Sequence, residues 1–108
     1  MANALLDVQQ TFTSLDTQYS MLRLACKTDA DLKALADKYG DAQANYEECA
    51  GKMLSDDDKE VADLSSQLKT ANQKVAKLEA EMGAMSVVID DITQAVTLGS
   101  QLVAKIPV

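Results

Sequence analysis

The chain has 108 residues, a formal net charge of −7, 47% hydrophobic residues and 4% aromatic residues. This length predicts a single domain over residues 1–108, and the low aromatic content, with four Gly and one Pro, favours an all-α fold over a β-sandwich. The acidic balance argues against nucleic-acid binding and against attraction to anionic membranes.

The N-terminal quarter predicts a helix over residues 3–27. Asn3 is a suitable N-cap, and the apolar positions that follow alternate spacings of three and four, as in a coiled-coil seam. The seam consists of Leu5, Val8, Phe12, Leu15, Tyr19, Leu22 and Cys26. Leu6, Met21 and Leu24 lie outside it, and this wider apolar arc predicts contact with more than one neighbour.

A second helix is expected over residues 29–50, with Thr28 as its N-cap and Gly51 as the residue that ends it. It repeats the same spacing through Leu32, Leu35, Tyr39, Ala42, Tyr46 and Cys49. If the two helices are antiparallel, Cys26 and Cys49 lie roughly 30 Å apart by helix rise. We therefore expect two buried thiols and no disulfide.

The rest of the chain predicts one long helix over residues 55–105, with Ser55 as its N-cap. Its seam comprises Val61, Leu64, Leu68, Ala71, Val75, Leu78, Met82, Met85, Ile89, Ile92, Val96, Gly99, Val103 and Ile106. Gly83 allows an alternative, because a turn there would divide the helix and give a four-helix bundle. We prefer the continuous helix, since no capping residue surrounds Gly83 and the heptad phase continues across it. The predicted architecture is thus an antiparallel helical bundle or coiled coil, with two helices of about 22–25 residues followed by one long helix.

The segment after Gly83 is nearly uncharged and apolar over a broad arc, so it needs cover from another surface. The predicted interaction residues are Val88, Ile89, Ile92, Val96, Leu98, Leu102 and Val103. On this hypothesis, replacing Leu98 and Leu102 by Asp would convert an oligomer into a soluble monomer.

No pattern in the sequence indicates chemistry. The chain has no His, its two Cys are too far apart for a CxxC motif, and its Gly residues are scattered rather than grouped in a phosphate-binding loop. The adjacent acids Asp90 and Asp91 point about 100° apart on a helix, which predicts a solvated face or polar contacts for a partner. We predict a non-enzymatic protein with no catalytic, cofactor-binding or metal-binding residues.

These features favour a structural or adaptor protein that acts through self-association, with a homodimer as the first expectation, or through docking onto the helices of a partner protein. One alternative is a membrane-active helical protein that uses residues 83–108, and another is a small secretion chaperone or antidote for one cognate protein. The first residues lack the regions of a signal peptide, and no apolar run is long enough to span a membrane. A cytoplasmic location is expected, with export by a signal-less route as the alternative.

Overall fold

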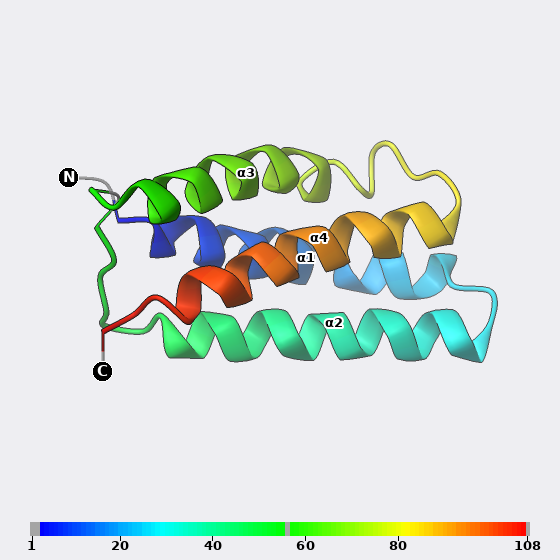
Figure 1. Ribbon diagram of the computed structural model, residues 1–108. Coiled ribbons are helices and arrows are strands. Elements are labelled where there is room, and N and C mark those ends of the chain that lie inside the picture. The colour runs from blue at the N-terminus through cyan, green and yellow to red at the C-terminus, as the bar shows by residue number, and fades with distance from the viewer. Residues whose placement is uncertain (1–2, 56, 108) are drawn as a thin grey trace.

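Four helices make up the computed structural model, which describes residues 3–55 and 57–107. The helices are α1 (Leu5–Ala25), α2 (Asp29–Glu48), α3 (Lys59–Val75) and α4 (Met85–Val103). Successive helices run in opposite directions and form an elongated bundle of 43 × 22 × 18 Å (Figure 1). The all-α class predicted from the sequence is confirmed.

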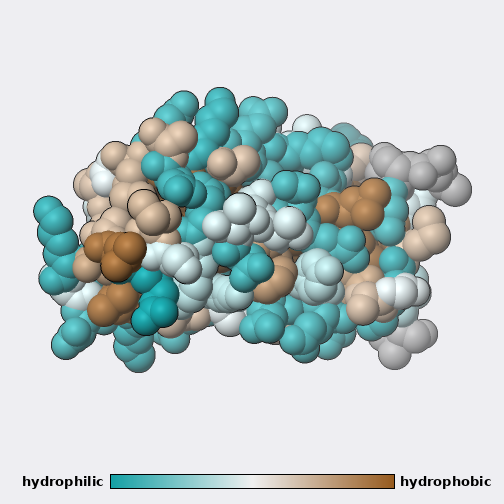
Figure 2. All heavy atoms as spheres, turned by 180° about the vertical axis from the view of Figure 1, so that it is seen from behind, coloured by the Kyte–Doolittle hydropathy of each residue, from teal (hydrophilic) through white to brown (hydrophobic). Residues whose placement is uncertain are grey.

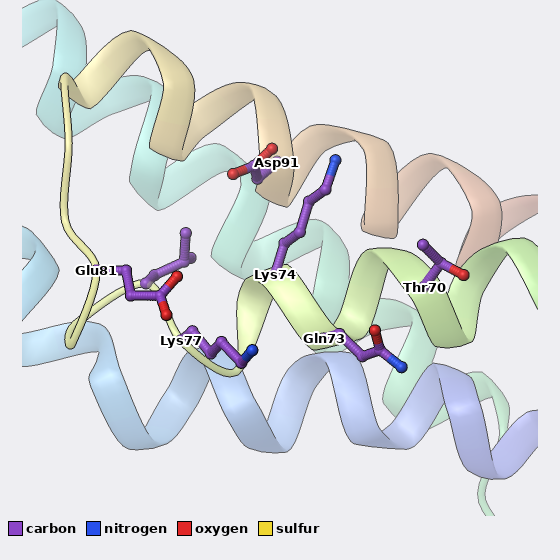
Figure 3. A pocket seen from close by; sticks show the side chains of 7 residues that line it. Thr70, Gln73, Lys74, Lys77, Glu81 and Asp91 are labelled. Atoms are coloured by element: carbon purple, nitrogen blue, oxygen red, sulfur yellow. The ribbon is translucent and has the colours of Figure 1, made fainter.

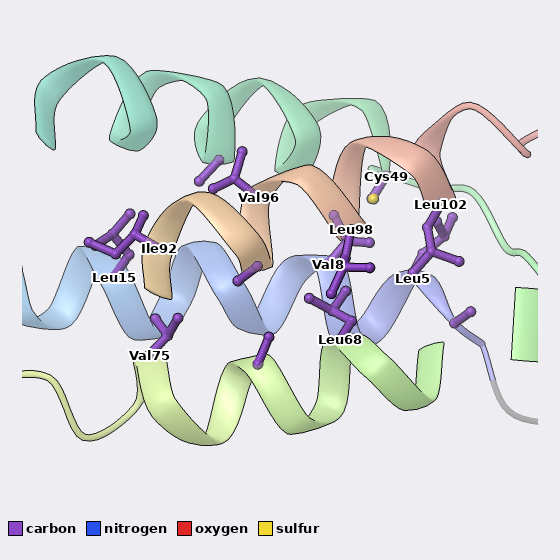
Figure 4. Packing of buried hydrophobic residues seen from close by; sticks show 14 of the residues in the cluster. Leu5, Val8, Leu15, Cys49, Leu68, Val75, Ile92, Val96, Leu98 and Leu102 are labelled. Atoms are coloured by element: carbon purple, nitrogen blue, oxygen red, sulfur yellow. The ribbon is translucent and has the colours of Figure 1, made fainter. Parts of the chain in front are cut away.

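The centre of the bundle is the pair α1 and α4. Each of these two helices contacts the other three, whereas α2 and α3 make no contact with each other among the described residues. Helix α1 is therefore covered by α4 on one side and by α2 and α3 on the two adjacent sides, and its fourth side faces solvent. The core between the helices contains the side chains of Leu5, Leu15, Leu68, Val75, Ile92 and Leu102, each fully buried (Figure 4).

The first two helices lie within the predicted ranges but are shorter: α1 spans Leu5–Ala25 with Ala4 at its N-cap position, and α2 spans Asp29–Glu48. The Oδ1 atom of Asn3 accepts a hydrogen bond from the backbone N–H of Leu5 at 3.1 Å, and the hydroxyl of Thr28 accepts one from Asp31 at 3.1 Å. Gly51 has a φ of 69°, in the left-handed region where Gly is favoured after a helix. These contacts satisfy backbone groups that have no partner inside the helix.

The third helix begins later than expected, because Asp58 and not Ser55 is its N-cap. The Asp58 carboxylate accepts hydrogen bonds from the N–H groups of Glu60 and Val61, and α3 starts at Lys59. Ser55 instead lies in an isolated antiparallel bridge with Asn3. This bridge joins the start of α1 to the α2–α3 loop.

The continuous helix expected over residues 55–105 is wrong, and the alternative division near Gly83 is the one observed. The chain leaves helical geometry after Val75 and resumes it at Met85. In a continuing helix, the N–H of Glu79 would donate to the carbonyl of Val75. The amide of Gln18 separates these two groups: its Nε2 donates to the Val75 carbonyl at 2.6 Å, and its Oε1 accepts from the Glu79 N–H at 2.7 Å. Gln18 on α1 is thus hydrogen-bonded to the chain at the point where α3 ends. Helix α4 folds back from there, so the apolar positions of α3 and α4 pack in one core.

Gln18 belongs to a polar interface between α1 and α3. Within residues 3–55 and 57–107, the buried polar residues all lie on these two helices: Thr11, Ser14, Gln18, Ser65 and Asn72. Thr11 donates to the Oδ1 atom of Asn72 at 2.6 Å, and the Nδ2 atom of Asn72 donates to the backbone carbonyl of Asp7 at 2.8 Å. The Asp7 carboxylate accepts from Ser65 at 2.6 Å and from Lys69 at 2.9 Å. Every buried side-chain polar atom of the described residues has a partner.

Candidate functional site

The predicted interaction residues of α4 lie mainly inside the bundle. Val88, Ile92, Val96, Leu98 and Leu102 are at most 7% exposed, and Ile89 and Val103 are partly buried. The broad apolar arc of this segment is therefore covered by the chain's own helices (Figure 4). A direct role of these residues in binding another protein stays a prediction, and in this fold it would require α4 to leave the bundle.

Apolar residues reach the surface at both ends of the bundle: Leu6 and Met53 are 59% and 72% exposed near the two termini, and another group is exposed at the opposite end. We call this the distal end; there α1 passes into α2, and the α3–α4 linker passes into α4 (Figure 1). Leu24 is 80% exposed and Val87 is 54% exposed, and Met21 and Leu32 are exposed to a lesser degree. Seen from behind, strongly hydrophobic residues gather at this end (Figure 2). Single exposed apolar residues are ordinary, but a group of them around a concave surface is typical of a binding site.

A groove of about 660 Å³ lies between the α1–α2 turn and the α3–α4 linker, and we call it the distal groove. Its lining consists of Ala25, Lys27, Thr28, Asp31, Met82, Gly83, Ala84, Met85 and Ser86. Met82 and Met85 are partly buried against the core and supply flexible, polarisable side chains. Lys27 and Asp31 add one charge of each sign. The groove can therefore receive apolar side chains while its polar residues orient the segment that carries them.

The two cysteines do not add reactivity to this surface. Both thiols are free, with Cys26 partly buried near the distal groove and Cys49 fully buried at the end of α2. Burial raises the pKa of both thiols, and the charge of Asp31 raises the pKa of Cys26 further. A raised pKa keeps a thiol protonated at neutral pH and lowers its nucleophilicity.

Comparison with known protein families shows which family the chain belongs to. Residues 6–99 match the family described as control of competence regulator ComK, YlbF/YmcA. The chain belongs to the YlbF/YmcA family. Neither the comparison with curated proteins nor the comparison with solved structures gave a match.

The YlbF/YmcA match extends from the start of α1 into the last turns of α4, so it includes the distal groove and both connections that form it. The family description names control of a regulator, which is a regulatory role. Within residues 3–55 and 57–107, no helix is long and apolar enough to cross a membrane, and no three metal-ligating side chains are grouped.

A second groove of about 240 Å³ lies between α3 and the start of α4 (Figure 3). It is lined by Thr70, Gln73, Lys74, Lys77, Leu78, Glu81 and Asp91. The charges of two Lys and two acids balance there, so the groove has no preference for an anion or a cation. Asp91 faces this groove while Asp90 is exposed to solvent, as expected for adjacent acids on a helix.

Sequence reasoning missed the distal groove because the long helix was expected to continue through it. Met82 and Met85 were assigned to a coiled-coil seam, and the reversal of the chain places them instead beside the α1–α2 turn. One signal was present: Met21 and Leu24 lie outside the seam of α1, and both are exposed at the distal end. Leu6 lies outside the same seam at the other end of α1 and is also exposed, so this signal alone does not locate the groove.

Proposed function

We propose that this YlbF/YmcA-family chain is a non-enzymatic helical adaptor that exerts its regulatory role by docking a partner protein in the distal groove. The observation that carries this proposal is the apolar groove between Met82, Met85 and the α1–α2 turn; exposed Val87 directly follows the lining residue Ser86 in the sequence. The regulatory description of the family supports binding to another protein, and it supports action inside the cytoplasm, where we place it.

The partner segment that fits this groove is apolar and short, such as one face of a helix. Met side chains adapt to differently shaped apolar residues, which suits a protein that recognises a motif and not a single rigid surface. Lys27 and Asp31 lie at the α1–α2 side and would favour a segment with polar residues of both signs at its edge. The membrane-active alternative would need residues 83–108 to leave the bundle, where they supply much of the core.

The proposal can be tested by site-specific cross-linking in the producing cells. A photo-reactive amino acid at Val87 should cross-link a second protein, whereas the same amino acid at Thr97, on the exposed face of α4, should not. The variant Gly83→Glu with Ser86→Glu places two negative charges in the groove, and it should abolish the cross-link. Neither change should disturb folding, because the space around Gly83 is open and Ser86 is exposed at the acid-favouring start of α4.

The matched control is Thr97→Glu with Gln101→Glu, which adds the same charge to the exposed face of the same helix. In a strain that lacks the natural chain, the groove variant should fail to control the competence regulator. The control variant should still control it. Equal regulation by both variants, or equal cross-linking from Val87 and Thr97, would refute docking in the distal groove.

A further inference from the structure

Two stretches of extended backbone border the distal groove, one in the α1–α2 turn and one in the α3–α4 linker. In the turn, Cys26 and Thr28 have extended backbone angles, with ψ values of 129° and 156°. In the linker, residues 82–84 lie outside any helix, and Ala84 has a ψ of 140°. The groove therefore has extended main chain on two sides, although the protein around it is helical.

The main-chain polar groups of these two stretches are unpaired within residues 3–55 and 57–107. They include the carbonyls of Met82 and Gly83 and the N–H groups of Lys27, Thr28, Met82, Gly83 and Ala84. Gly83 lines the groove and has no side chain, so its backbone itself borders the groove. A Cβ atom at Gly83 would meet no atom within 4 Å, so another chain can approach this backbone closely.

An apolar groove accepts either one face of a helix or an extended segment, and the unpaired groups distinguish between the two. Water bonds these groups in the free protein, but a docked segment displaces that water. A helix uses its own N–H and C=O groups internally, so it would cover the groups of the linker without bonding them. Each polar group covered in this way weakens docking about fivefold or more. An extended segment has free N–H and C=O groups along its edges and can bond them, as in the addition of a strand to a sheet.

The groove also contains a carboxylate without an ion-pair partner. Asp31 lines the groove, is partly buried, and forms no ion pair among the residues that the structure describes. A basic residue of a docked segment would pair with this carboxylate where docking expels water, and the net charge of −7 attracts basic segments in general. Lys27 is exposed, so an ion pair with it would contribute little.

We propose that the partner docks in the distal groove as an extended, strand-like segment that places a basic residue beside Asp31. The main chain of the segment exchanges hydrogen bonds with residues 82–84, and its apolar side chains contact Met82 and Met85. This inference rests on the proposed docking function and specifies what is recognised, an apolar and basic sequence in extended conformation. Main-chain bonding gives affinity without fixing the sequence, which agrees with the adaptable Met side chains beside it.

Ala84→Pro tests the main-chain contact, because it removes one N–H group and little else. Ala84 has a φ of −60°, close to the value that Pro imposes, and its N–H group has no acceptor in the described part of the chain. The photo-cross-link from Val87 should fall at least about threefold in this variant, as expected for the loss of one hydrogen bond. Ala84→Ser is the matched control: it keeps the N–H group and should keep the cross-link. Thermal unfolding followed by circular dichroism verifies that both variants are folded.

Asp31→Asn tests the basic residue of the partner. It keeps the size and polarity of the side chain but removes its charge, and it should lower the cross-link from Val87 at least about fivefold. Asp29→Asn is the matched control, because Asp29 carries the same charge in the same turn of α2 but does not line the groove. Its cross-link should equal that of the natural chain.

These variants separate the extended segment from the docking function itself. Equal cross-links in Ala84→Pro and Ala84→Ser, with the cross-link lost in Gly83→Glu with Ser86→Glu, would overturn the extended segment while docking in the groove stands. Equal cross-links in Asp31→Asn and Asp29→Asn would overturn the basic residue. Absence of any cross-link from Val87 in the otherwise natural chain would overturn docking in the groove, and this inference with it.

Discussion

Gln18 should contribute more to the free energy of unfolding than its place on a polar face of α1 suggests. Gln18 is 6% exposed, and its amide bonds the carbonyl of Val75 and the N–H of Glu79, two groups that a regular helix would join to each other. Gln18→Leu removes both hydrogen bonds: the Glu79 N–H loses its partner, and the Val75 carbonyl keeps only the long bond from the Leu78 N–H at 3.4 Å. A polar group left without a partner costs roughly 1–3 kcal/mol and a lost hydrogen bond roughly 1 kcal/mol, so we expect the free energy of unfolding to fall by about 2–4 kcal/mol. A loss of this size lowers the melting temperature of a small domain by at least about 10 °C.

Urea unfolding followed by circular dichroism measures this loss directly. The matched control is Gln94→Leu, which makes the same chemical change at an exposed position of α4 and should alter stability by less than about 0.5 kcal/mol. If Gln18→Leu is as stable as the natural chain, the amide does not hold the end of α3. Hydrogen exchange at the Glu79 amide gives a second readout, since its protection should fall in the variant even where global stability recovers.

Three further predictions concern the core, the N-terminal contact and pH. Leu98→Asp with Leu102→Asp should unfold the chain and not release a soluble monomer, because both side chains are buried in its own core; a folded double variant by circular dichroism would contradict this. Asn3→Ala should destabilise the fold by about 1–2 kcal/mol in urea unfolding, since its side chain bonds both the start of α1 and the α2–α3 loop. The hydrogen bond from Tyr39 to Asp16 raises the pKa of the tyrosine, so the stability that this contact gives is present at neutral pH and declines as pH rises through tyrosine ionisation. Asp16→Asn should lower the pKa of Tyr39, measured by ultraviolet titration, and an unchanged titration would contradict this cause.

The local signals in the sequence predicted the ends of α1 and α2 to within two residues. Asn3, Thr28 and Gly51 each act through contacts or backbone geometry within a few residues, so their effect can be recognised without knowledge of the fold. The predicted start of α3 at Ser55 was wrong. Ser55 and Asp58 are both good capping residues, and the structure places Ser55 in the bridge with Asn3 and Asp58 at the N-cap of α3.

The sequence offered a division near Gly83 only as the alternative to a continuous helix, because the cause of the observed break lies 57 residues away in the sequence. The apolar period continues unchanged across the break, and Gly83 has neither a positive φ nor a crowded environment. Gln18 ends α3 by inserting its amide into the helical hydrogen-bond ladder, a recognised cause of irregularity in helices. The reversal of the chain at this point forms the distal groove. The candidate site therefore could not be located from the sequence, for the same reason.

The polar interface between α1 and α3 connects these observations. Apolar contacts alone would permit α3 to slide along α1 by a turn, since aliphatic seams repeat every seven residues and differ little between registers. A shift of one turn would separate Thr11 from Asn72 and Gln18 from the end of α3, and each polar group left unpaired would cost roughly 1–3 kcal/mol. The buried hydrogen bonds therefore determine where α3 stops. That position determines where the linker begins, and so places Met82 and Met85 beside the α1–α2 turn. In this chain the polar residues of the core specify the shape of the apolar surface that we propose as the docking site.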